Sequence, residues 1–143
     1  MEHLFGIQLE SHNGPVPTSS VVFRYKLVYF SAEWSPLCNT LTSELLAFYN
    51  MINSYEKIFE VLFVSYDRNK SDFIKHFAKM PWLAINYKNK KRVKMLEKKF
   101  GVKEIPFLAL IDDDGNMKNN DVRNDIMTKG LAALNAWDIA LCR

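Results

Sequence analysis

The chain is poor in cysteine, glycine and proline, with 2, 5 and 5 of these residues among 143. Two cysteines, Cys38 and Cys142, are too few for the disulfide framework of a small secreted domain. The first thirty residues also lack a basic segment followed by a long apolar core, so no secretory leader is expected. These absences predict a protein of the cytoplasm or of the nucleus.

Long apolar runs and a strong excess of one charge are missing as well. No run approaches the roughly 18 apolar residues of a membrane span, and basic residues outnumber acidic ones by only 19 to 16. The main basic cluster, residues 88–99, contains Val93 and Leu96 at helical spacing. This pattern predicts the solvated side of an amphipathic helix. We therefore expect neither a membrane nor a nucleic acid as a partner.

The sequence offers no recognisable metal site. His3, His12 and His76 are isolated, and none has a ligand spacing with Cys38. The acidic run 112–114 lacks the ligand pattern of a calcium-binding loop and predicts a turn instead. No metal and no cofactor is predicted.

The chain does contain enough apolar residues for a core, since 48% of it is hydrophobic. Its length predicts a single domain over residues 1–143. Apolar runs predict strands at 21–30, 59–66 and 107–111, and helical spacing predicts helices at 36–55, 67–79, 88–100 and 131–141. Residues 4–9 alternate weakly and predict an edge strand, and 112–116 predict a hairpin to a short strand, 117–119. This order predicts an α/β sandwich of three layers, a central mixed β-sheet with helices on both faces.

The segment Trp34-Ser35-Pro36-Leu37-Cys38 follows the first buried strand and opens a helix. Two cysteines at this spacing would indicate a thiol-disulfide centre, but a serine occupies the first position. Pro36 suits the first helical turn and makes Ser35 a candidate N-cap. The alternative, Ser35 as a nucleophile, is disfavoured because no histidine stands at an obvious base position beside it.

The same segment resembles a known family. YFSAEWSPLC, residues 29–38, is similar to the YFSA-x-WCPPC segment of tryparedoxins and nucleoredoxins, a branch of the thioredoxin superfamily. Residues 59–85 resemble the family's strand, helix and M-P-W-L-A block, and residues 100–110 resemble its F-x-V-x-x-I-P-T-L segment. The resemblance covers nearly the whole chain and implies a thioredoxin-like fold.

The resemblance also implies roles for single residues. The attacking cysteine of the family falls on Ser35 and the resolving cysteine on Cys38, so these are the candidate catalytic positions. A cis-proline loop falls on Ile105 and Pro106. Leu37 and Phe107 depart from the family pattern, as Ser35 does, and Tyr29 stands where ordinary thioredoxins keep a buried acid. The implied substrate-binding residues are Trp34, Pro36, Leu37, Ile105, Pro106 and Phe107.

Two functional hypotheses follow. In the first, the chain has lost dithiol turnover because of Ser35 and binds a protein or peptide at the old active-site groove. In the second, Cys38 acts alone through glutathione, or an active W-C-x-x-C oxidoreductase carries an engineered serine at position 35. The sequence leaves open whether Cys38 is buried and inert or a reactive thiol, and whether it pairs with Cys142. It also leaves Trp82 either in the core or on an exposed patch around the site.

Overall fold

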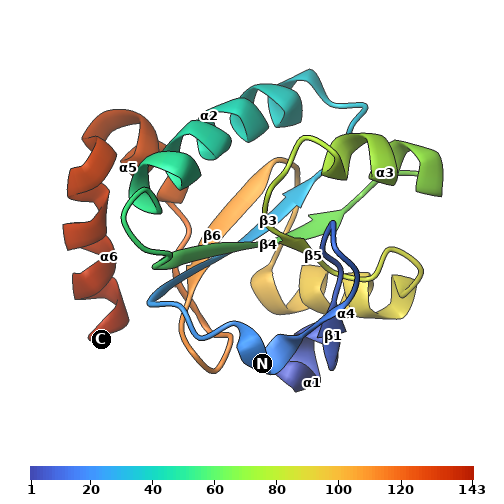
Figure 1. Cartoon of the computed structure of the whole chain (residues 1–143), viewed down its shortest axis with the longest axis horizontal. Coiled ribbons are helices and arrows are strands. Elements are labelled where there is room, and N and C mark those ends of the chain that lie inside the picture. The colour runs from blue at the N-terminus through green and yellow to red at the C-terminus, as the bar shows by residue number, and fades with distance from the viewer.

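A mixed β-sheet lies at the centre of the molecule, which the computed structural model describes over residues 1–143. The sheet has five strands in the order β5-β4-β3-β6-β7 (Figure 1). Strand β3 pairs in parallel with β4 and antiparallel with β6, so it occupies the middle of the sheet. The strands are β3 (Tyr25–Ser31), β4 (Phe59–Ser65), β5 (Leu83–Ala84), β6 (Phe107–Ile111) and β7 (Met117–Asn119).

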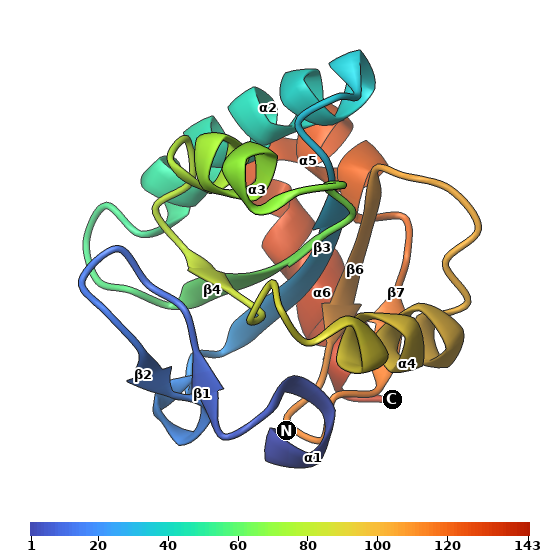
Figure 2. The same cartoon turned by 90° about the vertical axis from the view of Figure 1, so that its right-hand side faces the viewer.

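Helices cover both faces of this sheet (Figure 2). Alternate side chains of β3 point to opposite faces, Leu27 and Tyr29 to one core cluster, Val28 and Phe30 to the other. The first cluster lies under α2 (Pro36–Ile52), α3 (Lys70–Phe77), α5 (Val122–Lys129) and α6 (Ala133–Leu141), and the second under α1 (Glu2–Phe5) and α4 (Lys90–Phe100). The predicted three-layer, thioredoxin-like sandwich is confirmed. No helix combines the length and the apolar character needed to cross a bilayer.

Local sequence signals explain where the main helices begin and end. The side chains of Ser35, Asn69 and Asn89 cap α2, α3 and α4 by accepting a backbone N–H from the first turn. Pro36 occupies the first turn of α2, as predicted. Helix α4 ends at Gly101, whose φ of 65° is left-handed and therefore suits glycine.

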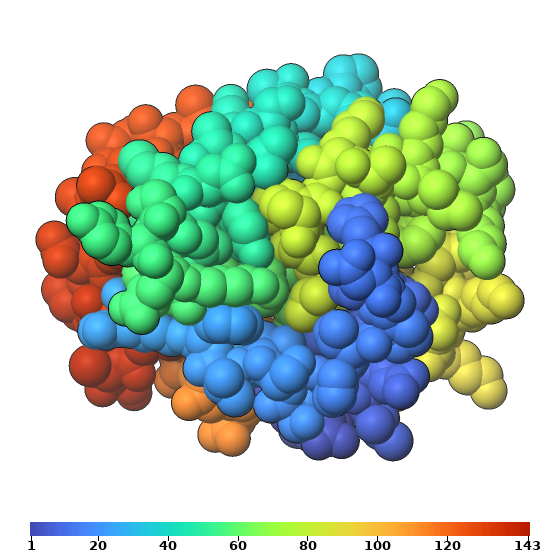
Figure 3. Space-filling model, viewed as in Figure 1, coloured from blue at the N-terminus to red at the C-terminus, as the bar shows by residue number.

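The predicted edge strand over residues 4–9 is wrong. Leu4 and Phe5 lie in the short helix α1 and are both buried, because the segment turns its two apolar residues together against α4. Only β1 (Gln8–Leu9) is extended, and it pairs with β2 (Val16–Pro17) in a separate two-stranded sheet. An isolated bridge between Glu10 and Ala84 joins this segment to β5, and Figure 3 shows the blue N-terminal segment lying against the yellow-green one.

Other boundaries differ from the prediction. The strand expected from residue 21 begins at Tyr25, because Thr18–Ser20 form a 3-10 turn and Val22 is 78% exposed. The helix expected at 36–55 ends at Ile52, the one expected at 67–79 spans Lys70–Phe77, and the one expected from residue 88 begins at Lys90. The final helix has a companion, α5, that the sequence reading missed, as it missed the two-residue strand β5. Trp82 is fully buried, which confirms its place in the core.

Candidate functional site

The segment 34–38 follows the carboxyl end of the central strand β3, where the chain leads into α2 (Figure 2). Strand β6 begins at this same end of the sheet, because its register pairs Phe107 with Phe30 near the end of β3. Ile105 and Pro106, joined by the predicted cis peptide bond, come directly before Phe107. The topology thus brings the candidate catalytic segment and the proline loop to the same end of two neighbouring strands.

Ser35 is held as a helix cap. Its Oγ accepts a hydrogen bond from the backbone N–H of Cys38 at 3.3 Å, and its own N–H donates to the carbonyl of Ala32 at 3.3 Å. The side chain is buried, and no histidine makes a hydrogen bond with it. The capping role predicted for Ser35 is therefore confirmed, and nothing in its surroundings would remove its proton.

Cys38, one turn into α2, is completely buried. The hydroxyl of Tyr29 donates to the Cys38 carbonyl at 3.0 Å and lies 2.8 Å from Thr42 Oγ1. Burial raises the pKa of Tyr29 to about 12, so this phenol stays neutral and cannot replace the acid that thioredoxins keep here. Cys142 is exposed and both cysteines are free, so the structure holds no bridge between them.

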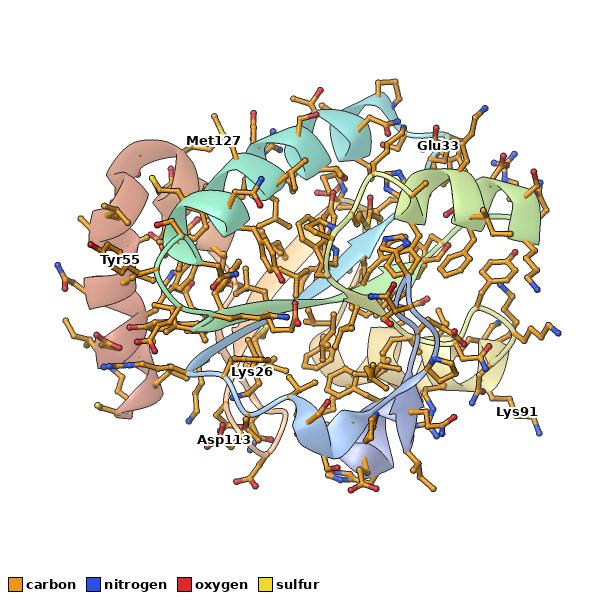
Figure 4. All side chains as sticks on the ribbon, viewed as in Figure 1. Lys26, Glu33, Tyr55, Lys91, Asp113 and Met127 are labelled. Atoms are coloured by element: carbon orange, nitrogen blue, oxygen red, sulfur yellow. The ribbon has the colours of Figure 1, made fainter.

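The loop that precedes Ser35 is fixed through Glu33. The Glu33 N–H donates to Asp67 Oδ1 at 2.7 Å, and Asn39 Nδ2 donates to the Glu33 carbonyl at 2.8 Å. The carboxylate accepts from Lys79 Nζ and faces His76 Nδ1, both at 2.8 Å from Oε2. Partial burial would raise the pKa of Glu33, but the hydrogen bonds from Lys79 and His76 outweigh it and lower the pKa. Figure 4 shows Glu33 beside the start of α2 and next to α3.

His76 is fully buried beneath this loop. Burial lowers its pKa despite the neighbouring Glu33, so the ring is neutral near pH 7. Because the ionised Glu33 can only accept, Nδ1 carries the proton, and Nε2 accepts from Ser31 Oγ at 2.7 Å. The array of Ser31, His76 and Glu33 has the bonding order of a hydrolase triad, but Ser31 is completely buried and has no access to a substrate. The sequence reading missed this network, since no motif spacing links its members.

The candidate substrate-binding residues differ in exposure, those beside Ser35 in the chain being exposed and those of the proline loop half-buried. Trp34 is 50% exposed and Leu37 is 60% exposed, and Pro36 is exposed between them. Ile105, Pro106 and Phe107 are half-buried at the same end of the sheet. The backbone of Ile105 makes no hydrogen bond with the rest of the chain. An extended peptide could therefore pair with it without breaking an existing contact.

Trp34 is oriented by the segment that follows β4. Its Nε1 donates to the carbonyl of Tyr66 at 3.4 Å, and the Arg68 guanidinium lies over its ring, 5.3 Å from the centroid. The tyrosine ring of Tyr66 packs edge-on against Phe30 at 5.7 Å. The indole thus has a defined position while half of its surface faces solvent.

Comparison with known proteins places this arrangement in a family. A thioredoxin-like family model matches residues 24–117. Tryparedoxin of Trypanosoma brucei brucei is 42% identical over 106 residues, which cover 74% of this chain and 73% of that protein. Nucleoredoxin of Danio rerio is 33% identical over 136 residues, covering 95% of this chain. The chain spans 32% of the length of that nucleoredoxin, about a third.

Solved structures agree with the sequence comparisons. Tryparedoxin from Trypanosoma brucei superposes with a TM-score of 0.82 at 36% identity, covering 92% of this chain and 90% of that one. Tryparedoxin II in complex with glutathionylspermidine superposes with a TM-score of 0.81 at 30% identity, covering 88% of both chains.

Proposed function

This chain belongs to the thioredoxin-like family, in its tryparedoxin and nucleoredoxin branch, and we propose that it binds an extended peptide without cycling a dithiol. The observation that carries the proposal is at Ser35, where a hydroxyl caps α2 in the position of the attacking sulfur. Thiol-disulfide exchange needs a thiolate to attack a disulfide and a second thiol to resolve the mixed disulfide. Ser35 supplies no thiolate, and the Cys38 thiol is buried behind it.

Peptide binding needs no sulfur, and two features of the chain support it. Trp34 and Leu37 provide exposed apolar area, and the unpaired backbone of Ile105 provides a donor and an acceptor for an added strand. A partner protein presenting an extended apolar segment fits these features. We place this function in the cytoplasm or the nucleus.

Reduction of insulin by dithiothreitol tests the loss of turnover. We expect the unmodified chain to give no rate above the uncatalysed background, because no mixed disulfide can form at Ser35. Ser35→Cys creates a W-C-P-L-C dithiol and should raise the rate at least about tenfold. The double variant Ser35→Cys, Cys38→Ser is the matched control and should fall back, since the resolving thiol is gone. Substantial turnover by the unmodified chain would contradict the proposal.

A second candidate is favoured by Trp34, Pro36 and Cys38, which match the family's W-C-P-P-C segment. In this candidate the chain is an oxidoreductase that works through Cys38 alone with glutathione, or one whose attacking cysteine has been replaced by engineering. Cys38 is fully buried, so a glutathione adduct requires the first turn of α2 to open. Alkylation of the native Cys142→Ser variant distinguishes the candidates. Rapid modification of Cys38 supports the single-thiol enzyme, and complete protection excludes it.

A further inference from the structure

A hollow of about 330 Å³ is lined in part by Arg68, the residue whose guanidinium lies over the indole of Trp34. It runs between the segment after β4 and the polar side of α4. Tyr66 and Arg68 belong both to this hollow and to the surroundings of Trp34, so the hollow lies near the exposed indole. Its lining residues are Ser65, Tyr66, Asp67, Arg68, Lys90, Val93, Lys94 and Glu97.

The two acidic side chains of the hollow are already engaged. Asp67 is buried and accepts hydrogen bonds from Ser65 Oγ and from the Glu33 N–H, each at 2.7 Å. Glu97 Oε2 accepts from the Tyr66 hydroxyl at 2.7 Å. Burial, together with that contact, raises the pKa of Tyr66, which keeps the phenol protonated as a donor. Both carboxylates thus accept hydrogen bonds from within the chain.

The three basic side chains, in contrast, have no acidic partner. Arg68, Lys90 and Lys94 are exposed, and none of them takes part in an ion pair within the chain. Arg68 lies on Trp34, and Lys90 Nζ lies 3.3 Å from the centroid of the Tyr87 ring. Aromatic rings thus hold two of the cationic groups near the hollow, which lowers the entropy lost when they bind an anion.

We propose that this hollow selects the partner of the site as a peptide with acidic side chains, carboxylates that bind Arg68, Lys90 and Lys94 next to the segment seated on Trp34. This inference rests on the proposed function, because it names the chemical class of the bound peptide. The planar guanidinium of Arg68 suits a two-point contact with a carboxylate, and the lysines add charge at the rim. The same groups repel a polycationic ligand.

Titration calorimetry with three matched peptides tests the selection. Each peptide has the same extended apolar centre, followed by Glu-Asp-Glu, by Gln-Asn-Gln or by Lys-Lys-Lys. At low salt we expect the acidic peptide to bind about tenfold more tightly than the amide peptide, and the lysine peptide to bind most weakly. Added salt should reduce the preference, because the contacts are solvent-exposed.

Charge-removing variants locate the effect. Lys90→Gln combined with Lys94→Gln should remove most of the preference for the acidic peptide and leave the amide peptide unchanged, because both lysines line the hollow from α4 and only Arg68 lies on Trp34. Lys91→Gln together with Lys99→Gln removes the same charge from α4 without touching the hollow, and it should keep the preference. Figure 4 shows Lys91 far from Glu33.

The outcomes separate this inference from the proposed function. Equal binding of all three peptides overturns the acidic selection and leaves peptide binding intact. An equal loss of preference in the control variant also overturns it, since the effect would then be one of net charge. Inorganic phosphate displacing the acidic peptide at matched ionic strength would assign the hollow to free anions instead. Absence of binding by any of the peptides overturns both proposals.

Discussion

At the scale of single residues, His76 makes the loop around Glu33 sensitive to acid. The pKa of His76 is lowered from 6.5 by burial in the folded chain, so the unfolded chain takes up a proton at a higher pH than the folded chain does. The contribution of His76 to the free energy of unfolding is therefore fully present above about pH 6.5. It declines as the pH falls toward the pKa of His76 in the folded chain. Glu33, whose pKa is lowered below 4.5, adds a second loss at more acidic pH.

We expect the free energy of unfolding to fall between about pH 7.5 and about pH 5.5. Urea unfolding at the two pH values measures it. His76→Gln removes the titrating ring and should make the fall smaller, while His3→Gln, at an exposed histidine, should leave it unchanged. An unchanged pH dependence in His76→Gln would show that His76 is not the group responsible.

At the scale of elements, α4 packs on the second face of the sheet. It also supplies Lys90 and Lys94, the two lysines of the proposed acidic-peptide site. Its C-terminal stop depends on Gly101, at φ 65° with open space where a Cβ would lie. Gly101→Ala should lower the free energy of unfolding by about 1 kcal/mol, because the left-handed conformation is strained with a side chain. Urea unfolding measures this value. Lys98→Ala, exposed in the last turn, is the control and should change stability by only a few tenths, about 0.3 kcal/mol.

The elements also show how far the sequence predicts this fold. Strands β3 and β4 are buried on both faces, so each is an almost entirely apolar run, interrupted by Lys26 in β3 and by Glu60 in β4. Ser35 with Pro36 marks the start of α2. Short elements were missed or misassigned, because α1 has only one turn to show a period and β5 has two residues. The contacts of Glu33 with His76 and Lys79 were also missed. They join residues more than forty positions apart, and only the tertiary fold brings those residues together.

At the scale of the whole molecule, segments outside the matched range 24–117 complete the cores. Phe5 belongs to the cluster under α4, and Trp137 belongs to the cluster under α2. We therefore propose that residues 1–143 form one domain. Phe5→Ala should lower the free energy of unfolding of the entire chain by about 3–5 kcal/mol, because the ring is almost completely buried.

Urea unfolding followed by circular dichroism and by hydrogen exchange measures this change. A single cooperative transition is expected for the native chain and for Phe5→Ala alike. Ile7→Ala, at a side chain that is 72% exposed, should have almost no effect. A separate early transition confined to the N-terminal segment would contradict the one-domain proposal.

The three tryptophans differ sharply in their surroundings. Trp82 and Trp137 are sealed in the core, whereas Trp34 is 50% exposed under the Arg68 guanidinium. Trp34 is consequently an intrinsic fluorescence probe of its surroundings. Acrylamide quenching and red-shifted emission arise from a single indole at the edge of the binding surface, and an incoming ligand would reveal itself by shielding that indole, with no dye attached.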